Sequence, residues 1–269
     1  MKTIEVTKID WTRIDRNHHA PEMVGDNDDL LLIDSETGEV IAFQRQIPEK
    51  YKHLKKELSR YLRFSIKYDS TASKTGAARL SGMNYSNRVF GFTAPQALRR
   101  RYGVSTSSFN KDEPQALKIL EELTKVCWDT FEELAPKTAE KHFQLAQQIH
   151  SDWHIGGMPF TSGIINNSAA LPYHKDTGNI KGTWNNMFCV KENVSGGGLH
   201  LPEYNVAFGI PDGSISGFDG QGAWHGVTPF MKKRNDAHRF TIVWYTKSGM
   251  VGSGSVEEET LKAKQKATK

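Results

Sequence analysis

This sequence has few cysteines and no long apolar run, and both absences exclude common classes of protein. Its two cysteines, Cys127 and Cys189, lie far apart and form no CxxC motif. Neither a disulfide framework nor a zinc site is therefore indicated, and both thiols are expected to be buried. No apolar run approaches the length needed to span a bilayer, and the N-terminus lacks the apolar core of a signal peptide. We expect no membrane association and a cytoplasmic protein, in the host cytoplasm if a phage encodes it, or a nuclear one in a eukaryote.

The chain also lacks a strong excess of either charge. A net charge of +4 and a pI near 8.9 permit an anionic partner without requiring one. With 37% hydrophobic residues, the 30.3 kDa chain can form one large domain with a real core. We expect a monomer with a single domain over residues 1–250, divided into a helical and hairpin part (1–155) and a β-rich core (156–250). Residues 251–269 are small and then charged, which predicts a flexible tail.

Basic residues are nevertheless concentrated in two places. Six lysines and arginines fall between residues 52 and 67, and Arg99, Arg100 and Arg101 follow an aromatic, glycine-bearing segment at 87–92. Basic side chains displace counterions from a nucleic-acid backbone, and aromatic rings can stack on bases. The alternative is an ordinary solvated helix surface, which charge alone favours.

Hydrophobic patterns predict an early hairpin, a helical middle and a β-rich end. Runs at 30–34 and 39–43 flank a turn that ends in Gly38, which is typical of a hairpin. Helices are predicted over 48–62, 95–101, 112–136 and 137–149. Short strands separated by turns are predicted at 163–165, 187–190, 205–210, 214–218, 223–227 and 239–245. This order predicts an α+β fold with a double-stranded β-helix (jelly-roll) core and N-terminal helices packed on one sheet.

The most informative motif is His174-Lys175-Asp176, with His225 and Arg239 further along the chain. On a β-strand, residues at i and i+2 point to the same side, so His174 and Asp176 can bind one ion together, with His225 as a third ligand. Two imidazoles and a carboxylate leave coordination positions open, as in non-haem Fe(II) oxygenases. The guanidinium of Arg239 can bind the distal carboxylate of 2-oxoglutarate.

Each part of this motif is weak when taken alone, because a bare H-x-D is often a turn or a surface feature. The small residues around His225, at 222–229, favour a ligand because they allow the backbone to approach it closely. His200, which lies between two leucines, is the alternative third ligand. His238 is expected to face away from its neighbour Arg239 if both lie on a strand.

Several segments together resemble the TET/JBP family of Fe(II)/2-oxoglutarate-dependent DNA base dioxygenases, which has relatives in bacteriophages and protists. The resemblance runs in order through about residues 160 to 247 and is carried by 173–179, 197–204, 211–219, 224–229 and 239–245. The segments 87–91 and 99–101 resemble the family more loosely. The resemblance implies that His174, Asp176 and His225 bind Fe(II), and that Arg239 binds 2-oxoglutarate, which is consumed together with O₂. The cysteine-rich segment of the animal proteins is absent, so zinc is not expected.

The resemblance also implies a set of contacts to the substrate. Asn179 matches a position that contacts the target base, and Tyr245 matches one where an aromatic ring packs on it. Lys247 stands where the mammalian enzymes have a histidine, which leaves open which base edge is read. Asn166, with Asn167, is expected either to line the same cavity or to form a turn before the H-x-D segment. Arg99 and Arg100 are expected to contact the nucleic acid.

The function implied is oxidation of the 5-methyl group of a pyrimidine in DNA, from 5-methylcytosine to 5-hydroxymethylcytosine and beyond. A methyl group inside a duplex is out of reach, so the target base must be flipped into the site. The alternatives are the same chemistry on thymine, giving 5-hydroxymethyluracil, and a 2-oxoglutarate oxygenase that hydroxylates a protein side chain or a small molecule. A non-catalytic jelly-roll binding module is the remaining alternative.

Overall fold

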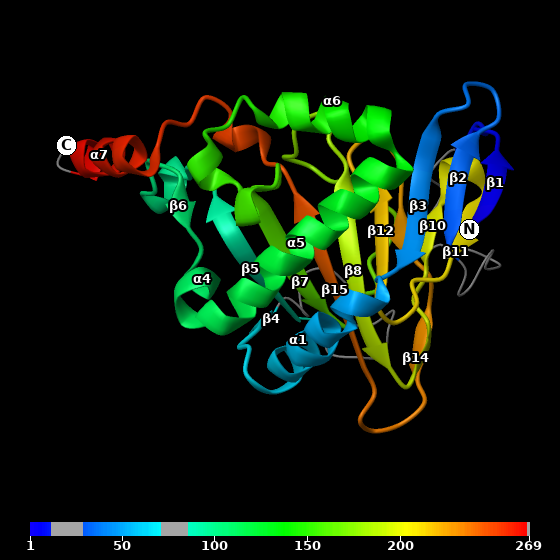
Figure 1. Ribbon diagram of the computed structural model, residues 1–269. Helices are drawn as coiled ribbons and strands as arrows, with labels where there is room; N and C mark the ends of the chain where they lie inside the picture. Colours follow the sequence, from blue (N-terminus) through cyan, green and yellow to red (C-terminus); the bar gives the residue numbers. More distant parts are fainter. Residues whose placement is uncertain (12–28, 71–85, 268–269) are drawn as a thin grey trace.

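A ten-stranded sheet forms the centre of the molecule (Figure 1). The computed structural model describes residues 1–11, 29–70 and 86–267. Neighbouring strands are antiparallel except for the first pair, β1 and β2. Across the sheet the strands are β1 (Lys2–Val6), β2 (Leu30–Asp34), β3 (Val40–Gln46), β12 (Ser214–Phe218), β8 (Asn185–Glu192), β15 (His238–Tyr245), β7 (Ser162–Asn167), β5 (Ser86–Thr93) and β4 (Asp69–Ser70), with β6 (Ser105–Thr106) paired to β5.

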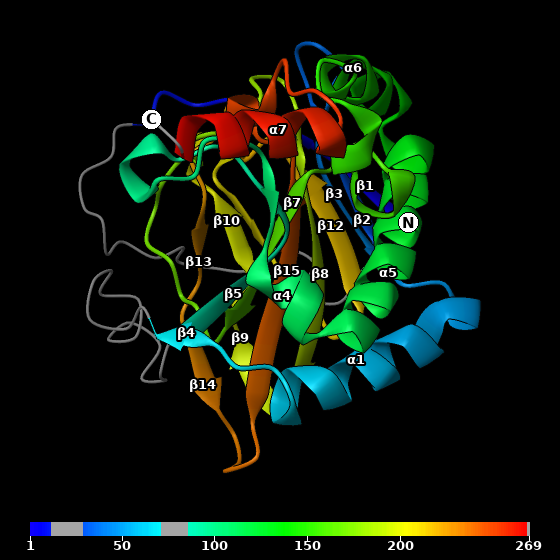
Figure 2. The ribbon, with the colours of Figure 1, turned by 90° about the vertical axis from the view of Figure 1, so that its left-hand side faces the viewer.

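Shorter strands face one side of this sheet and form the second layer of the core (Figure 2). They are β10 (Leu199–Leu201), which pairs with β11 (Val206–Phe208) and β13 (Gly226–Val227), and β9 (Val194–Gly196), which pairs with β14 (Phe230–Lys232). The apolar side chains of β10 and β11 pack against Met187 and Cys189 of β8. The predicted α+β fold with a double-stranded β-helix core is confirmed.

Helices cover the opposite face of the sheet, as predicted (Figure 2). They are α1 (Lys52–Phe64), α4 (Ser108–Asp112), α5 (Pro114–Leu134) and α6 (Pro136–Ala146). The apolar stripe of α5 is buried against side chains that include Phe188 of β8 and Trp244 of β15. Pro136 begins α6 as well as limiting α5, because proline is favourable at the first position of a helix. Both cysteines are free and buried, as predicted.

Short 3₁₀ helices connect several of these elements. They are η1 (Glu49–Tyr51), η2 (Ala97–Arg99), η3 (Ser151–Trp153), η4 (Ile155–Gly157), η5 (Pro202–Tyr204) and η6 (Ser248–Met250). The helix predicted over 95–101 is reduced to the single turn of η2, because the backbone of Gln96 pairs with that of Arg101 and closes the segment into a turn. The hairpin of β2 and β3 is confirmed, with Gly38 in its turn at φ +70°.

Of the two interpretations of the basic clusters, the structure supports the solvated helix surface over a basic face with interleaved aromatic rings. Phe90 lies on β5 and is fully buried, with its ring against Phe109 and Trp244, so it belongs to the core. On α1, basic side chains pair with acids: Lys55 with Asp212, Lys52 with Glu49, and Arg63 with Glu192. Helix α1 is therefore an ordinary solvated helix surface, as the alternative interpretation predicted.

The C-terminal segment differs from the predicted flexible tail, because helix α7 (Val256–Ala267) forms there. Acidic residues in its first turn stabilise this helix, because their negative charges interact favourably with the positive end of the helix dipole. Glu259 is only 3% exposed, and its carboxylate accepts hydrogen bonds from the backbone N–H groups of Val104 (2.9 Å) and Gly254 (3.2 Å). These bonds to Glu259, together with one from the N–H of Val256 to Asp152 at 3.0 Å, attach the helix where apolar surface is lacking. In the described ranges of the chain, no helix is long and apolar enough to cross a membrane.

Candidate metal centre

Backbone pairing brings the two halves of the H-x-D…H motif together. His174 and Asp176 lie in the connection between β7 and β8 rather than on the β-strand that the motif suggested. His174 forms an isolated bridge with His225, with N–H to O distances of 2.9 and 3.0 Å in the two directions. The backbone N–H of Asp176 donates to the carbonyl of Gly220 at 2.8 Å. These bonds fix the two segments side by side without an extended strand.

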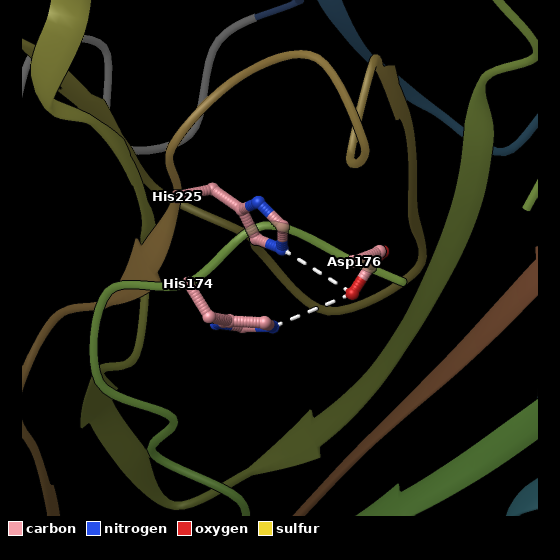
Figure 3. Close-up of side chains that lie close together, drawn as sticks. All are labelled: His174, Asp176 and His225. Atoms are coloured by element: carbon pink, nitrogen blue, oxygen red, sulfur yellow. Dashed lines mark ion pairs between the residues drawn. The ribbon is translucent and has the colours of Figure 1, made fainter. Parts of the chain in front are cut away.

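The three side chains converge on one point (Figure 3). Nε2 of His174 lies 3.4 Å from Oδ1 of Asp176, and Nε2 of His225 lies 3.8 Å from the same oxygen. The three donor atoms lie within 4.8 Å of one another. Two nitrogen donors and one carboxylate on one side of an ion form a facial triad, which leaves the opposite positions open for a cosubstrate and O₂.

Hydrogen bonds from the far side of each ring prepare the imidazoles as ligands. Nδ1 of His174 lies 2.8 Å from the carbonyl oxygen of Pro172, and Nδ1 of His225 lies 3.1 Å from that of Ala223. A carbonyl can only accept, so Nδ1 donates in both rings and Nε2 keeps its lone pair. Burial, together with the neighbouring His174, lowers the pKa of His225 to about 4. The ring is therefore neutral and able to bind a metal ion at physiological pH.

Asn185 orients the carboxylate of Asp176, and Asn179 in turn orients Asn185. Burial alone would raise the pKa of Asp176, but the two histidines beside it and the amide of Asn185 together lower it, so the group is ionised. Nδ2 of Asn185 donates to Oδ2 of Asp176, and Oδ1 of Asn185 accepts from Nδ2 of Asn179 at 3.0 Å. A chain of side chains thus joins the candidate metal ligand Asp176 to Asn179, the predicted base contact.

A cavity of about 610 Å³ opens beside the triad between the two layers of the core. Alternation along β15 turns one set of its side chains into the cavity and the other set toward the helices. The lining from β15 consists of Arg239, Thr241, Val243 and Tyr245. The three triad residues also line the cavity, as do Asn166, Asn179 and Lys247.

Arg239 is buried in this cavity without an acidic partner among the residues that the structure describes. Its side chain donates to the carbonyls of Ala169 (3.2 Å) and Gly197 (2.7 Å), and its Nε has no hydrogen-bond partner. Burial lowers its pKa, yet a guanidinium keeps its proton. A buried, uncompensated cation with a free donor fits the distal carboxylate of 2-oxoglutarate.

The remaining predicted residues are placed as follows. Lys247 is half-buried, its partial burial lowers its pKa, and its Nζ lies 5.7 Å from the centre of the Tyr245 ring. Arg100 is exposed and does not line the cavity, and the side chain of Arg99 lies outside the described part of the structure. The base-contacting roles of these residues stay predictions.

His200, the alternative third ligand, does not lie at the metal centre. Its Nδ1 is hydrogen-bonded to the hydroxyl of Tyr173 at 2.6 Å, and it is not part of the cluster of potential metal ligands. The neighbours of His200 on β10 point to the opposite face of the strand, and one of them, Leu199, lines the cavity. Nε2 of His238 lies 4.0 Å from Glu192, away from the partners of Arg239, as predicted.

Sequence reasoning missed Asn185 and the glycines that make room for the site. A Cβ on Gly220 would collide with Nδ2 of Asn185 and Oδ2 of Asp176, and a Cβ on Gly197, at φ +76°, would lie 2.6 Å from Nε of Arg239. The strand predicted at 187–190 offered one signal, because extending it by two residues puts Asn185 on the same face as Met187.

This fold and this site define an Fe(II)- and 2-oxoglutarate-dependent oxygenase. Residues 90–248 match the model of the Tet_JBP family, the oxygenase domain of the 2OGFeDO superfamily. The chain belongs to this family, so it is an Fe(II)/2-oxoglutarate-dependent dioxygenase that uses Fe(II) and takes 2-oxoglutarate as cosubstrate.

Solved structures of low sequence identity are similar to this chain, and the first of them shares its fold. NgTET1 in complex with 5mC DNA has a TM-score of 0.60 and 13% identity, and the match covers 91% of this chain and 88% of that one. An oxidoreductase of the 2OG-Fe(II) oxygenase family from Burkholderia pseudomallei has a TM-score of 0.44 and 12% identity, over 74% of this chain and 82% of that one. No curated protein matches the sequence.

Proposed function

We propose that this enzyme oxidises the 5-methyl group of a pyrimidine base in DNA, with 5-methylcytosine as the first substrate and 5-hydroxymethylcytosine as the product. One observation carries the proposal: the cavity that contains the triad and Arg239 is also lined by Asn179, Tyr245 and Lys247, a polar and aromatic set suited to a flipped base. The structural similarity to NgTET1, which was solved with 5mC DNA, supports the same substrate class.

On the cosubstrate side, each residue has a defined task. His174, Asp176 and His225 would hold the iron by two nitrogens and one oxygen, with both Nδ1 atoms fixed by backbone carbonyls. Arg239 would bind the distal carboxylate of 2-oxoglutarate through its unused Nε–H. When bound, the iron couples the decarboxylation of 2-oxoglutarate by O₂ to C–H hydroxylation, so that succinate, CO₂ and an alcohol are formed.

On the substrate side, hydrogen bonding determines which groups face the base. Asn179 uses Nδ2 as a donor to Asn185, so its Oδ1 is the atom left to accept from a base. Lys247 supplies a donor next to Tyr245. An acceptor beside a donor fits the N4 amino group and N3 of cytosine, and it also fits N3–H and a carbonyl oxygen of thymine. Thymine is therefore the second candidate substrate.

Tyr245 is suited to stacking on the flipped base. Its side chain is half-buried in the cavity wall, and burial raises the pKa of its hydroxyl, which stays protonated at physiological pH. A neutral ring held on a strand provides a rigid surface, and stacking on an aromatic ring is worth about 1–3 kcal/mol per base.

The test is reconstitution of the protein with Fe(II) and 2-oxoglutarate under anaerobic conditions, followed by O₂ and two DNA duplexes. One duplex contains 5-methylcytosine and the other contains thymine as its sole methylated base. The expected result is succinate formed in step with a 5-hydroxymethylpyrimidine nucleoside, identified by mass spectrometry. Succinate formation that is independent of DNA, with no modified nucleoside, would contradict the proposal and favour a protein or small-molecule substrate.

A further inference from the structure

One large apolar side chain projects entirely into solvent at the end of a basic turn. Leu98 is 104% exposed, the highest value among the exposed large hydrophobic residues of the described chain. It lies in η2, and the side chains of Arg100 and Arg101, which follow it, are also exposed. Full exposure of a leucine loses the free energy that its burial would contribute, about 1.5–3 kcal/mol. The turn therefore presents an apolar group to solvent directly beside two cations.

The turn that carries Leu98 is closed by its own backbone. The N–H of Gln96 donates to the carbonyl of Arg101 at 2.7 Å, and the reverse bond is 3.1 Å. Inside this pair, the N–H of Arg100 donates to the carbonyl of Ala97 at 2.9 Å, with Arg100 in the left-handed region at φ 54°. These bonds hold Leu98 at the tip of the turn.

The base of the turn is fixed at the edge of the cavity. On one side, Ala94 follows β5 and lines the cavity beside the triad. On the other side, the turn leads into Val104 and β6, where the buried carboxylate of Glu259 accepts the N–H of Val104. Helix α7 and β6 lie side by side at this end of the molecule (Figure 1). The C-terminal helix, which lies beyond the matched family domain at 90–248, thus supports the turn that carries Leu98.

Resting on the proposed function, we propose that Leu98 is an apolar wedge that enters the base stack of duplex DNA when the target nucleotide is flipped. A flipped base leaves a gap, and apolar side chains such as leucine can insert between base steps and support the distorted duplex. Arg100 and Arg101, exposed in the same turn, would supply cations for the phosphates beside that gap. The proposed wedge lies close to the cavity in the chain, because Ala94, which lines the cavity, precedes Leu98 by four residues.

A fluorescence measurement on protein without iron tests the wedge separately from turnover. The probe is a duplex that contains 5-methylcytosine with 2-aminopurine as its 3′ neighbour, because the fluorescence of 2-aminopurine rises when the base unstacks. Wild-type protein should raise the signal at saturation, and Leu98→Ala should lose most of that rise. Leu98→Phe, which keeps an apolar group at the tip, should retain it. Met231→Ala removes another exposed apolar side chain, on β14, and should behave as wild type.

Turnover by the iron-loaded enzyme provides the second measurement. Leu98→Ala should lose about tenfold or more in kcat/KM on duplex DNA and stay within about twofold of wild type on the same strand left single, where no gap has to be filled. Equal fluorescence and equal duplex turnover in wild type and Leu98→Ala would overturn the wedge while leaving the proposed function intact. Equal loss on both DNAs would also overturn it. A wild-type enzyme that neither binds nor oxidises any DNA would refute the proposed function itself.

Discussion

Asn185 should control how tightly the triad binds iron. It is 2% exposed, donates Nδ2 to Oδ2 of Asp176, and accepts from Asn179 at 3.0 Å. Asn185→Ala leaves the candidate ligands unchanged but removes the group that orients the carboxylate. Without it, Asp176 can rotate and direct Oδ1 away from the two histidines.

The size of the effect follows from the kind of bond that is lost. A hydrogen bond to a charged group contributes about 1.5–3 kcal/mol, and every 1.4 kcal/mol is about tenfold in an equilibrium constant. Loss of this bond should therefore weaken Fe(II) binding by about 10- to 100-fold, which agrees with the usual cost of removing an outer partner of a metal ligand. The Asn185→Ala protein should still fold, because its ligands and the surrounding strands are intact.

The assay is an anaerobic Fe(II) titration against a competing chelator, with thermal unfolding measured on the same samples. Ser216→Ala is the matched control, because it removes a buried hydroxyl without a hydrogen-bond partner on β12, next to β8, and it should leave the Kd unchanged. An Asn185→Ala protein that binds Fe(II) as tightly as wild type would refute the reasoning. So would a Kd shift of equal size in Ser216→Ala.

Two further predictions concern other parts of the molecule. Gly197→Ala should raise the KM for 2-oxoglutarate by about tenfold or more, because a methyl group 2.6 Å from Nε of Arg239 displaces the guanidinium. Gly38→Ala, at a similar positive φ with open space, is the control, and an equal KM in both variants would count against a role for Arg239 in binding. Burial alone would raise the pKa of Glu259, but hydrogen bonds from Lys262, Val104 and Gly254 lower it. This lowered pKa contributes stability above the ordinary glutamate pKa, which is lost as the pH falls through the folded value. Hydrogen exchange should therefore show α7 opening in acid before the main sheet, and an α7 as well protected as the sheet at low pH would contradict this.

The sequence was sufficient to predict what depends on pattern and residue chemistry. Strand periodicity and turn residues predicted the jelly roll, and the ligand types in H-x-D…H predicted a triad that the structure brings together at one point. The predicted local geometry was wrong, because His174 and Asp176 lie in a loop and not on a β-strand. The three side chains still come together as predicted, because the backbone bridge between His174 and His225 supplies the alignment that a strand would have given.

What the sequence did not reveal depends on contacts between distant residues. Nothing local marks Asn185 as the partner of Asp176, because only the pairing of β8 with its neighbours places it there. His200 looked like a ligand by residue type, but its ring is hydrogen-bonded to Tyr173 and lies on the other face of β10 from Leu199, which lines the cavity. Helix α7 is held by distant partners, since the carboxylate of Glu259 accepts from Val104 and the N–H of Val256 donates to Asp152, so composition alone suggested a tail.

The most direct test of the account is the stoichiometry of Fe(II) binding in three proteins: wild type, His225→Ala and His200→Ala. Wild type and His200→Ala should each bind one Fe(II) per chain, whereas His225→Ala should lose most of its affinity while unfolding at a similar temperature. A His225→Ala protein that binds one Fe(II) as tightly as wild type would contradict the claim that these distant segments form one metal centre.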